Sequence, residues 1–316
     1  IIRTIKELFI KNLTNSRELS KLIDTYLVPQ ELEKKSNAEV STPYKLRKEM
    51  LDKMPFAFWT TPKKVFEPCS GKGGFLIDII DRFMDGLKDT ILDETERYKT
   101  IVEKCLYWCD INKTNIFICK LLIDPYNQYK LNYHEGNTLE LDIKDKWTLD
   151  GFDGVIGNPP YNSSEKGRHI LWNLFVKMGI RLLKKNRYLL YVHPALWRKP
   201  VSNKSRLNGL FQQMVKDNTM LYLEIHNASD GLKIFKCGTR YDWYLLITNN
   251  TPINTQILDE EQVTQYINLK NLTWLPNSNY DLLNKVTNKK EKIQIIYSRS
   301  AYGNDKKWTN RTKTDV

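Results

Sequence analysis

The stretch VFEPCSGKGGF (residues 65–75) decides the fold, because it joins a short apolar segment to a glycine-rich turn and a helical pattern. Its first four residues predict a strand, and FLIDIIDRFM (75–84) continues as an amphipathic helix. Glycines at Gly71, Gly73 and Gly74 let the backbone approach a ligand closely, and a helix N-terminus favours anionic groups. The turn lacks the Gly-Lys-Ser/Thr ending of a P-loop, which disfavours a nucleoside triphosphate. The stretch therefore predicts a strand–turn–helix unit that either binds a ligand or closes a tight turn.

The same alternation of strand and helix continues toward the C-terminus. Helical patterns occupy 112–123 and 170–185, between segments that are apolar and short. Strands alternating with helices of 10–15 residues are typical of a doubly wound, mostly parallel α/β sheet. With the strand of the opening stretch, seven strands are expected; the other six lie at 106–110, 133–137, 152–158, 188–194, 220–227 and 241–249.

Three segments are predicted along the chain. Residues 1–40 have a helical pattern, residues 41–249 hold the α/β domain, and residues 250–316 consist of short Pro/Asn-punctuated pieces that indicate the start of a separate module. The charged stretch 86–100 reads as a surface insertion.

Two helix starts are predicted from capping residues. Asn15 or Ser16 can cap a helix in the N-terminal segment. Thr42 can cap the next helix, since Pro43 suits the first helical position.

Composition excludes several classes of protein. The chain has 316 residues and a formal net charge of +12. Its apolar content of 41%, with Trp, Tyr and Phe spread along the chain, excludes a disordered chain. Its mean hydropathy is −0.52 and no apolar run approaches about 18 residues, so no membrane span is expected. The start IIRTIKELFI (1–10) has neither Met nor a cleavage site, so we expect a trimmed chain without a secretory signal. An odd number of cysteines, five, favours reduced thiols and a cytoplasmic location.

The cysteines also raise the question of a metal site. Cys105, Cys109 and Cys119 lie close in sequence, but no CxxC pair exists and the four histidines are far apart. Buried structural thiols and no metal are therefore expected.

Positive charge is concentrated in one part of the chain. Residues 166–216 contain twelve basic residues and no Asp or Glu, and the tail from Asn284 adds more. This favours one basic face that binds a polyanion, with Arg198 and Lys199 as candidate DNA contacts. The alternative is the solvated face of an amphipathic helix.

A second motif, GNPPY (157–161), follows the apolar strand FDGVI. The Asn158 side-chain oxygen and the Pro159 carbonyl can both accept hydrogen bonds from one planar NH2 group, while Pro160 stiffens the turn and Tyr161 offers a stacking face. The alternative is a proline turn that closes the strand.

An acidic residue, Asp110, ends the expected strand 106–110. Such a side chain can bind both hydroxyls of a ribose, as in dinucleotide folds. The spacing from the glycine turn exceeds the usual spacing of about 20 residues, and the insertion at 86–100 accounts for the difference.

FEPCSGKGGF and DGVIGNPPY resemble the first and fourth motifs of S-adenosylmethionine-dependent amino-methyltransferases, in particular the gamma group of DNA adenine methyltransferases. VSTPYKLRKEM (40–50) is similar to the Thr-Pro segment that packs by the methionine moiety in this group. IFKCGTRYDWYLL (234–246) is similar to a late motif whose Phe, here Phe235, helps to hold a flipped base; an ordinary core phenylalanine is the alternative.

The resemblance covers residues 41–249 and implies a class I, Rossmann-like methyltransferase fold with S-adenosylmethionine as cofactor. Two positions depart from the family pattern: Cys69 replaces an Ala or Thr, and Asn137 replaces an Asp. The cofactor-binding residues that the resemblance implies are Thr42, Pro43, Glu67, Pro68, Cys69, Gly71, Gly73, Asp110, Ile111 and Asn137.

The implied reaction is methylation of the exocyclic N6 amine of a flipped adenine at Asn158, Pro159, Pro160 and Tyr161. Double-stranded DNA is the implied substrate, a cognate restriction endonuclease is a candidate partner, and neither metal nor membrane is expected. The alternatives are a methyltransferase of RNA or of a protein glutamine, or a non-catalytic DNA-binding subunit with the same fold. Intact NPPY disfavours the non-catalytic subunit, and the long chain beyond Tyr161 disfavours the glutamine enzyme. Cys69 lies inside the cofactor turn, so a packing thiol is expected there rather than a cytosine 5-position nucleophile.

Overall fold

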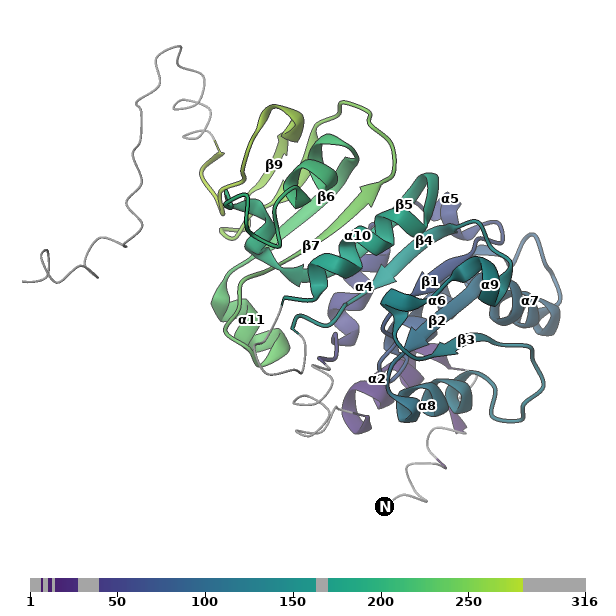
Figure 1. The fold of residues 1–316 in the computed structure, drawn as a ribbon. Helices are drawn as coiled ribbons and strands as arrows, with labels where there is room; N and C mark the ends of the chain where they lie inside the picture. Colours follow the sequence, from purple (N-terminus) through teal and green to yellow (C-terminus); the bar gives the residue numbers. More distant parts are fainter. Residues whose placement is uncertain (1–6, 8–10, 13–14, 28–39, 163–169, 281–316) are drawn as a thin grey trace, which may run out of the picture. The chain divides into compact units, whose positions relative to one another are not determined.

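One mixed sheet of nine strands organises the chain, and Figure 1 shows it with helices on its faces. The structure is a computed structural model that describes residues 7, 11–12, 15–27, 40–162 and 170–280. The chain divides into two compact units, Ile1–Ser278 and Asn279–Val316, and the sheet lies in the first. The strand order is β3-β2-β1-β4-β5-β7-β6-β8-β9. The strands are β1 (Val65–Glu67), β2 (Leu106–Asp110), β3 (Asn132–Glu135), β4 (Phe152–Gly157), β5 (Leu183–Pro194), β6 (Thr219–His226), β7 (Tyr241–Ile247), β8 (Thr255–Leu258) and β9 (Thr264–Ile267).

The strand order places the two sequence motifs side by side. β1 pairs in parallel with both β2 and β4, so the carboxyl ends of β1 and β4 meet at the same edge of the sheet. The glycine turn follows β1, and Asn158 follows β4 directly. Ligands bind at the carboxyl ends of strands in open α/β sheets. The topology therefore brings residues about 90 positions apart to one place.

Helices cover the sheet on both faces. α2, α4 and α5 pack against α6, whereas α10 packs on β4 and β5 (Figure 1). β1, β2 and β4 are buried along their whole length, as expected for central parallel strands with both faces covered. The helices are α2 (Ser16–Tyr26), α4 (Tyr44–Asp52), α5 (Phe56–Trp59), α6 (Gly74–Gly86), α7 (Glu94–Thr100), η1 (Ile101–Cys105), α8 (Lys113–Ile123), η2 (Thr138–Glu140), α9 (Ile143–Trp147), α10 (Trp172–Leu182), η3 (Ala195–Arg198), η4 (Gln212–Lys216), α11 (Ala228–Phe235) and η5 (Leu269–Asn271).

The predicted fold class is confirmed, and all seven expected strands are present. The sheet is wider than expected because β8 pairs in parallel with β6, and β9 pairs antiparallel with β8. Residues 250–278 therefore continue the sheet of the first unit, where a separate module was expected from residue 250. The two added strands have only four residues each, TQIL and TQYI, and β9 has no buried side chain, so neither has the long apolar run that marked most of the expected strands.

The two predicted helix starts have different outcomes. Asn15 caps α2, and its side chain accepts a hydrogen bond from the Glu18 amide at 3.1 Å. Pro43 occupies the cap position of α4 and no side chain caps that helix, so the prediction that Thr42 caps it is wrong. The hydroxyl of Thr42 is used elsewhere, as described below.

The charged stretch 86–100 is partly helical. Its second half forms α7, whose cap is Asp93, and η1 follows directly. None of the helices in the described part of the chain is long and apolar enough to cross a membrane.

Candidate functional site

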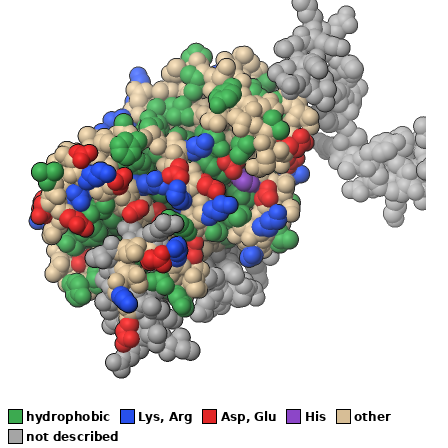
Figure 2. Space-filling model, turned by 180° about the vertical axis from the view of Figure 1, so that it is seen from behind, with side chains coloured by type: hydrophobic (Ala, Val, Ile, Leu, Met, Phe, Trp, Pro, Cys, Tyr) green, Lys and Arg blue, Asp and Glu red, His purple; other side chains and the backbone are tan. Residues whose placement is uncertain are grey.

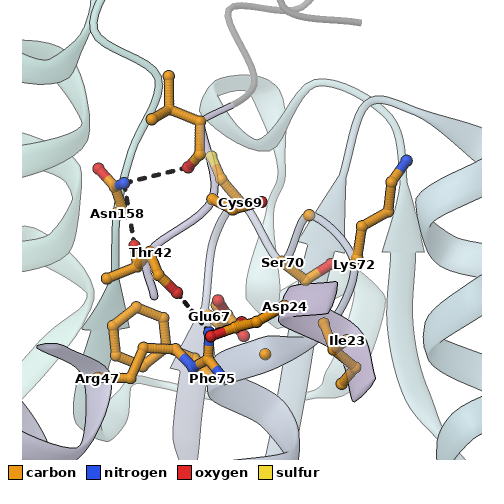
Figure 3. A pocket seen from close by; sticks show the side chains of 14 residues that line it. Ile23, Asp24, Thr42, Arg47, Glu67, Cys69, Ser70, Lys72, Phe75 and Asn158 are labelled. Atoms are coloured by element: carbon orange, nitrogen blue, oxygen red, sulfur yellow. Dashed lines mark hydrogen bonds and ion pairs between the residues drawn. The ribbon is translucent and has the colours of Figure 1, made fainter. Parts of the chain in front are cut away.

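A pocket opens where the glycine turn meets the end of β4 (Figure 3). Its empty volume is about 430 Å³ with the open mouth included. α2 and the segment 40–42 contribute one wall, and the turn after β1 contributes another. The lining residues are Ile23, Asp24, Val40, Ser41, Thr42, Arg47, Glu67, Cys69, Ser70, Gly71, Lys72, Gly74, Phe75 and Asn158.

The glycine turn requires its glycines for conformation and for space. Gly71 and Gly73 have φ values of 51° and 86°, in the left-handed region that favours glycine. A Cβ added at Gly74 would lie 2.7 Å from the guanidinium carbon of Arg47. The backbone therefore approaches its neighbours, and the pocket, more closely than any other residue type permits.

Asp110 holds the glycine turn through a hydrogen bond from the backbone. Its Oδ2 accepts a hydrogen bond from the Gly71 amide at 2.8 Å, and its Oδ1 accepts from the Asn112 amide at 2.8 Å and from Asn115 Nδ2 at 3.2 Å. The structure thus gives Asp110 a supporting contact to the turn that the sequence did not suggest. Its role toward a ribose remains a prediction.

Six of the ten predicted cofactor residues are not among the lining residues of the pocket, namely Pro43, Pro68, Gly73, Asp110, Ile111 and Asn137. Ile111 is 63% exposed just after β2. Asn137 caps η2, accepting from the Leu139 amide at 3.1 Å and donating to Glu140 at 2.6 Å. Pro43, Pro68 and Gly73 border the pocket through their lining neighbours, and their roles also remain predictions.

Glu67 is the least satisfied acid of the pocket. It is 2% exposed, and its Oε2 has no hydrogen-bond partner among the described residues. Burial raises the pKa of Glu67 well above the usual range, the charge of Arg47 opposes that shift, and Asp110 adds to it. A buried carboxylate with a spare oxygen is suited to a cationic or N–H-bearing ligand group.

The sequence did not suggest Arg47, which holds this wall of the pocket together. It is 2% exposed and donates to Asp78 at 2.6 Å and to Asp24 at 2.8 Å. Burial opposes its charge, but the two carboxylates outweigh that effect and the pKa of Arg47 is raised. Its other partners are the Ser20 hydroxyl and the Thr42 carbonyl.

The clue to Arg47 was its place on the helix of residues 44–52. It shares the buried face of α4 with Leu46, Met50 and Leu51. A charged residue on an apolar face indicates a buried ion pair.

Asn158 faces both the pocket and the 40–42 segment (Figure 3). Its Nδ2 donates to the Val40 carbonyl at 3.2 Å and to the Thr42 hydroxyl at 3.1 Å. Its Oδ1 is buried and has no hydrogen-bond partner among the residues that the structure describes. The amide therefore keeps one unused acceptor.

Aromatic rings gather beside Asn158. The Tyr161 ring meets Phe235 edge-on at 6.2 Å between centroids, and Phe235 meets Tyr241 at 4.9 Å. Burial raises the pKa of Tyr161. Phe235 is 8% exposed and also belongs to the apolar core. It therefore lies beside the NPPY motif, and both of its predicted roles, holding a flipped base and packing in the core, remain predictions. Pro159 is buried and Pro160 half-buried in the same turn.

The prediction that Arg198 contacts DNA is wrong. Arg198 is 3% exposed and donates to Asp242, at 2.7 Å, and to the carbonyls of Leu275 and Pro276. Its charge stabilises a buried carboxylate instead of a phosphate. The neighbouring Lys199 is exposed.

The basic stretch 166–216 does not act as one uniform patch. Lys184 and Arg187 both pair with Asp153, at 3.6 and 2.8 Å. Figure 2 shows a face on which basic and acidic side chains are interspersed. Residues 166–169 and the tail from residue 281 lie outside the described residues.

The cysteines differ in burial: Cys105, Cys109 and Cys119 are buried, Cys69 is half-buried and Cys237 is exposed. Burial raises the pKa of Cys105 to about 12, and it raises the pKa values of Cys69, Cys109 and Cys119 as well. A raised pKa disfavours the thiolate, so Cys69 is not an activated nucleophile. Among the described residues, no group of three or more His, Cys, Asp or Glu could hold a metal ion.

Comparisons with known proteins identify a similar family and similar folds. Residues 104–235 match the family model described as Eco57I restriction-modification methylase. A modification subunit of a putative type I restriction enzyme from Vibrio vulnificus YJ016 is similar, with 16% identity over 78% of this chain and 53% of that chain, at a TM-score of 0.55. A putative class I S-adenosylmethionine-dependent methyltransferase from Listeria monocytogenes shares 13% identity over 77% of this chain and 72% of that one, at a TM-score of 0.50. The fold is that of a class I methyltransferase.

A structure described as a complex assembly of the type I restriction-modification system gives a TM-score of 0.58, with 14% identity over 87% of this chain and 55% of that chain. The chain thus spans about half the length of the Vibrio vulnificus subunit and of the type I system chain. No curated protein matches the sequence.

The class I fold is shared with S-adenosylmethionine-dependent methyltransferases, so S-adenosylmethionine is the cofactor that the fold implies. The pocket residues fit such a ligand, since Glu67 has a spare buried oxygen and the glycine turn allows close approach. Placement in the gamma group stays a prediction.

Proposed function

We propose that this methyltransferase methylates the exocyclic N6 amine of adenine in DNA. The observation that carries the proposal is the position of Asn158, which lines the same pocket as the glycine turn and keeps its Oδ1 free. A methyl donor and the amine that accepts the methyl group must meet at one point. The glycine turn and Asn158 line one pocket, which would allow this.

The cofactor half of the pocket has three elements that suit S-adenosylmethionine. The carboxylate of Glu67 would bind a cationic or N–H group, the backbone at Gly71–Gly74 would approach the ligand, and the segment 40–42 would cover it. When bound, the cofactor supplies an activated methyl group on a sulfonium.

The acceptor half acts on the target amine. An adenine amine is a weak nucleophile because its lone pair is delocalised into the ring. Asn158 Oδ1 and the Pro159 carbonyl would accept hydrogen bonds from the two N–H groups of this amine. These bonds would shift electron density onto the nitrogen, which is electrostatic preorganisation. Tyr161 and Phe235 would hold the flipped base, whose unstacking costs a few kcal/mol.

DNA as substrate is supported by the family match and by similar structures that contain DNA. One is a DrdV–DNA complex, matched at a TM-score of 0.56 with 13% identity over 77% of this chain and 30% of that chain. Another is a type ISP restriction-modification enzyme, LlaBIII, bound to DNA. By analogy, this chain would act in the cytoplasm with a cognate restriction endonuclease.

The test is transfer of labelled methyl from S-adenosylmethionine to DNA, RNA or protein, followed by nucleoside digestion. We expect label in N6-methyladenine from DNA. Label in RNA or in protein would assign one of the alternative substrates, and absence of label from all three would favour a non-catalytic subunit.

The same assay tests the site. Asn158→Ala should lower turnover by about 10²–10³, the cost typical of losing one preorganised hydrogen-bonding group. Asn132→Ala is the matched control, since its Nδ2 also donates two hydrogen bonds, to the carbonyls of Glu103 and Leu106, but it lies in β3 outside the lining of the pocket. A fully active Asn158→Ala variant would refute the assignment of the site.

A further inference from the structure

We infer that Thr42 is a positioning residue that, with the Val40 carbonyl, sets the orientation of the Asn158 amide and so determines the rate of methyl transfer. This inference rests on the proposed function, because it concerns the oxygen that would accept the target amine. It goes further in assigning to the hydroxyl of Thr42 a role in the chemical step.

The Val40 carbonyl decides which end of the Asn158 amide faces it. A carbonyl can only accept, so the group 3.2 Å from it must be the NH2 of Asn158. Rotation of the amide by 180° would oppose two acceptor oxygens. The carbonyl therefore directs Oδ1 away from the 40–42 segment.

Thr42 accepts a hydrogen bond from the second hydrogen of the same NH2 group. Its hydroxyl accepts from Asn158 Nδ2 at 3.1 Å, and Thr42 is 5% exposed. With both hydrogens bound, the plane of the amide is fixed as well as its direction. The hydroxyl is available for this contact because it caps no helix.

Arg47 holds in place the two contacts that Val40 and Thr42 make with the Asn158 amide, which we call the clamp. The guanidinium donates to the Thr42 carbonyl while it is fixed by Asp24 of α2 and Asp78 of α6. Arg47 is nearly inaccessible to solvent, so these charge-assisted contacts form in a low-dielectric setting. The position of the 40–42 segment is therefore determined by the packing of three helices.

The orientation matters for chemistry more than for binding of the base. A rotated amide would present a donor to the target amine, which is also a donor, and would lose the acceptor that activates nitrogen. The aromatic contacts of Tyr161 and Phe235 would be unchanged. Loss of the clamp should thus lower kcat and leave the KM for DNA nearly constant.

The decisive variant is Thr42→Val, which keeps the shape of the side chain and removes the acceptor. We expect kcat to fall about 3- to 10-fold, the rate equivalent of one neutral hydrogen bond. Thr42→Ser keeps a hydroxyl and should restore most of the rate. Thr255→Val is the matched control. It removes a buried hydroxyl of β8 that donates a hydrogen bond to the Met220 carbonyl of β6, outside the lining of the pocket.

Coupling between the two residues gives a second measure. If Thr42 acts through Asn158, then Thr42→Val should lower the rate no further in an Asn158→Ala background. An additive effect would show that Thr42 acts independently and would overturn the inference.

A readout without catalysis separates this inference from the proposed function. Side-chain NH2 resonances of Asn158 should exchange slowly with solvent in the wild-type protein and faster in Thr42→Val. Wild-type transfer to adenine together with an unaffected Thr42→Val rate and unchanged exchange would refute the inference alone. If wild-type protein transfers no methyl to any substrate, the proposed function fails even where the exchange result supports the clamp.

Discussion

A single buried carboxylate, that of Asp242, depends on the guanidinium of Arg198. Asp242 is fully buried, and its Oδ2 accepts from Arg198 and from the indole of Trp197 at 2.7 and 2.9 Å. Burial raises the pKa of Asp242, and the charge of Arg198 opposes the shift. Removing one partner of a buried pair leaves an uncompensated charge.

We therefore expect Arg198→Ala to lower the free energy of unfolding by about 3–5 kcal/mol. Urea titration of the variant measures it. Lys199→Ala is the control, because this neighbouring side chain is exposed and its removal should change stability by no more than about 0.5 kcal/mol. Equal stability of the two variants would contradict a structural role for Arg198.

Glu67 links the stability of the unliganded protein to the affinity for a cation. Its folded pKa is raised above the unfolded value of 4.5, so its contribution to stability is present below about pH 4.5 and is lost as pH rises toward the folded pKa. Glu67→Gln carries no such charge. The variant should become increasingly more stable than the wild type as pH rises above about 4.5, as measured by urea unfolding.

The same substitution should weaken cofactor binding by about 1.5–3 kcal/mol, the range for hydrogen bonds to charged groups. A cationic ligand favours the ionised carboxylate, so wild-type binding should strengthen with pH and release a proton, and Glu67→Gln binding should do neither. Calorimetry in buffers of different ionisation enthalpy measures the proton. Identical proton release by both proteins would exclude Glu67 as its source.

At the scale of secondary structure, β5 and β7 are joined by a buried histidine. His193 on β5 stacks on Trp172 of α10 at 4.2 Å, and its Nε2 lies 3.0 Å from the Tyr244 hydroxyl on β7. Burial lowers the pKa of His193 to about 3. The folded state thus holds this imidazole neutral where the unfolded chain would protonate it.

The sign of the resulting pH dependence is definite. As pH falls below about 6.5, the unfolded chain binds a proton that the folded protein does not, so stability from His193 is lost at about 1.4 kcal/mol per pH unit. His193→Gln should reduce that slope between pH 4 and 6. His226→Gln should act at higher pH, because Glu224 and Asp230 outweigh burial and raise the pKa of His226. The stability that His226 contributes is present below about pH 6.5 and is lost as pH rises through its folded pKa, so the variant should lose stability relative to the wild type in that lower range.

How far the sequence predicts these elements depends on how local the signal is. The glycine turn and the strands beside it have local patterns, and their parallel pairing follows from the α/β alternation. β9 has no such pattern, since its side chains face solvent or are half-buried. The Arg47 and Arg198 ion pairs join residues up to 44 positions apart, and charge alone predicts a surface role for both.

At the scale of the whole molecule, the formal charge of +12 favours association with DNA. The described part of the basic stretch has exposed side chains at Arg181, Lys185, Lys199, Lys204 and Arg206, whereas Lys184 and Arg187 pair with Asp153 and Arg198 is buried against Asp242. Only the exposed side chains can release counterions from phosphates.

We expect the affinity for DNA to fall linearly with the logarithm of salt concentration. The double variant Lys199→Glu/Lys204→Glu should reduce that slope and weaken binding to all sequences alike. Lys99→Glu/Lys104→Glu makes the same change in net charge near α7 and should have a smaller effect. Anisotropy titrations at several salt concentrations give both slopes, and equal slopes for the two variants would remove the basic stretch from the interface.

The unequal burial of the thiols makes this protein easy to label at one chosen place. Cys237 is exposed, while Cys105, Cys109 and Cys119 are buried and hold their protons tightly. It follows α11 by two residues, next to Phe235, whose ring meets Tyr161. A maleimide dye added to the native protein would attach there in preference, without any cysteine being removed. The emission of the dye would then report in real time when a base enters or leaves the site beside Tyr161 and Phe235.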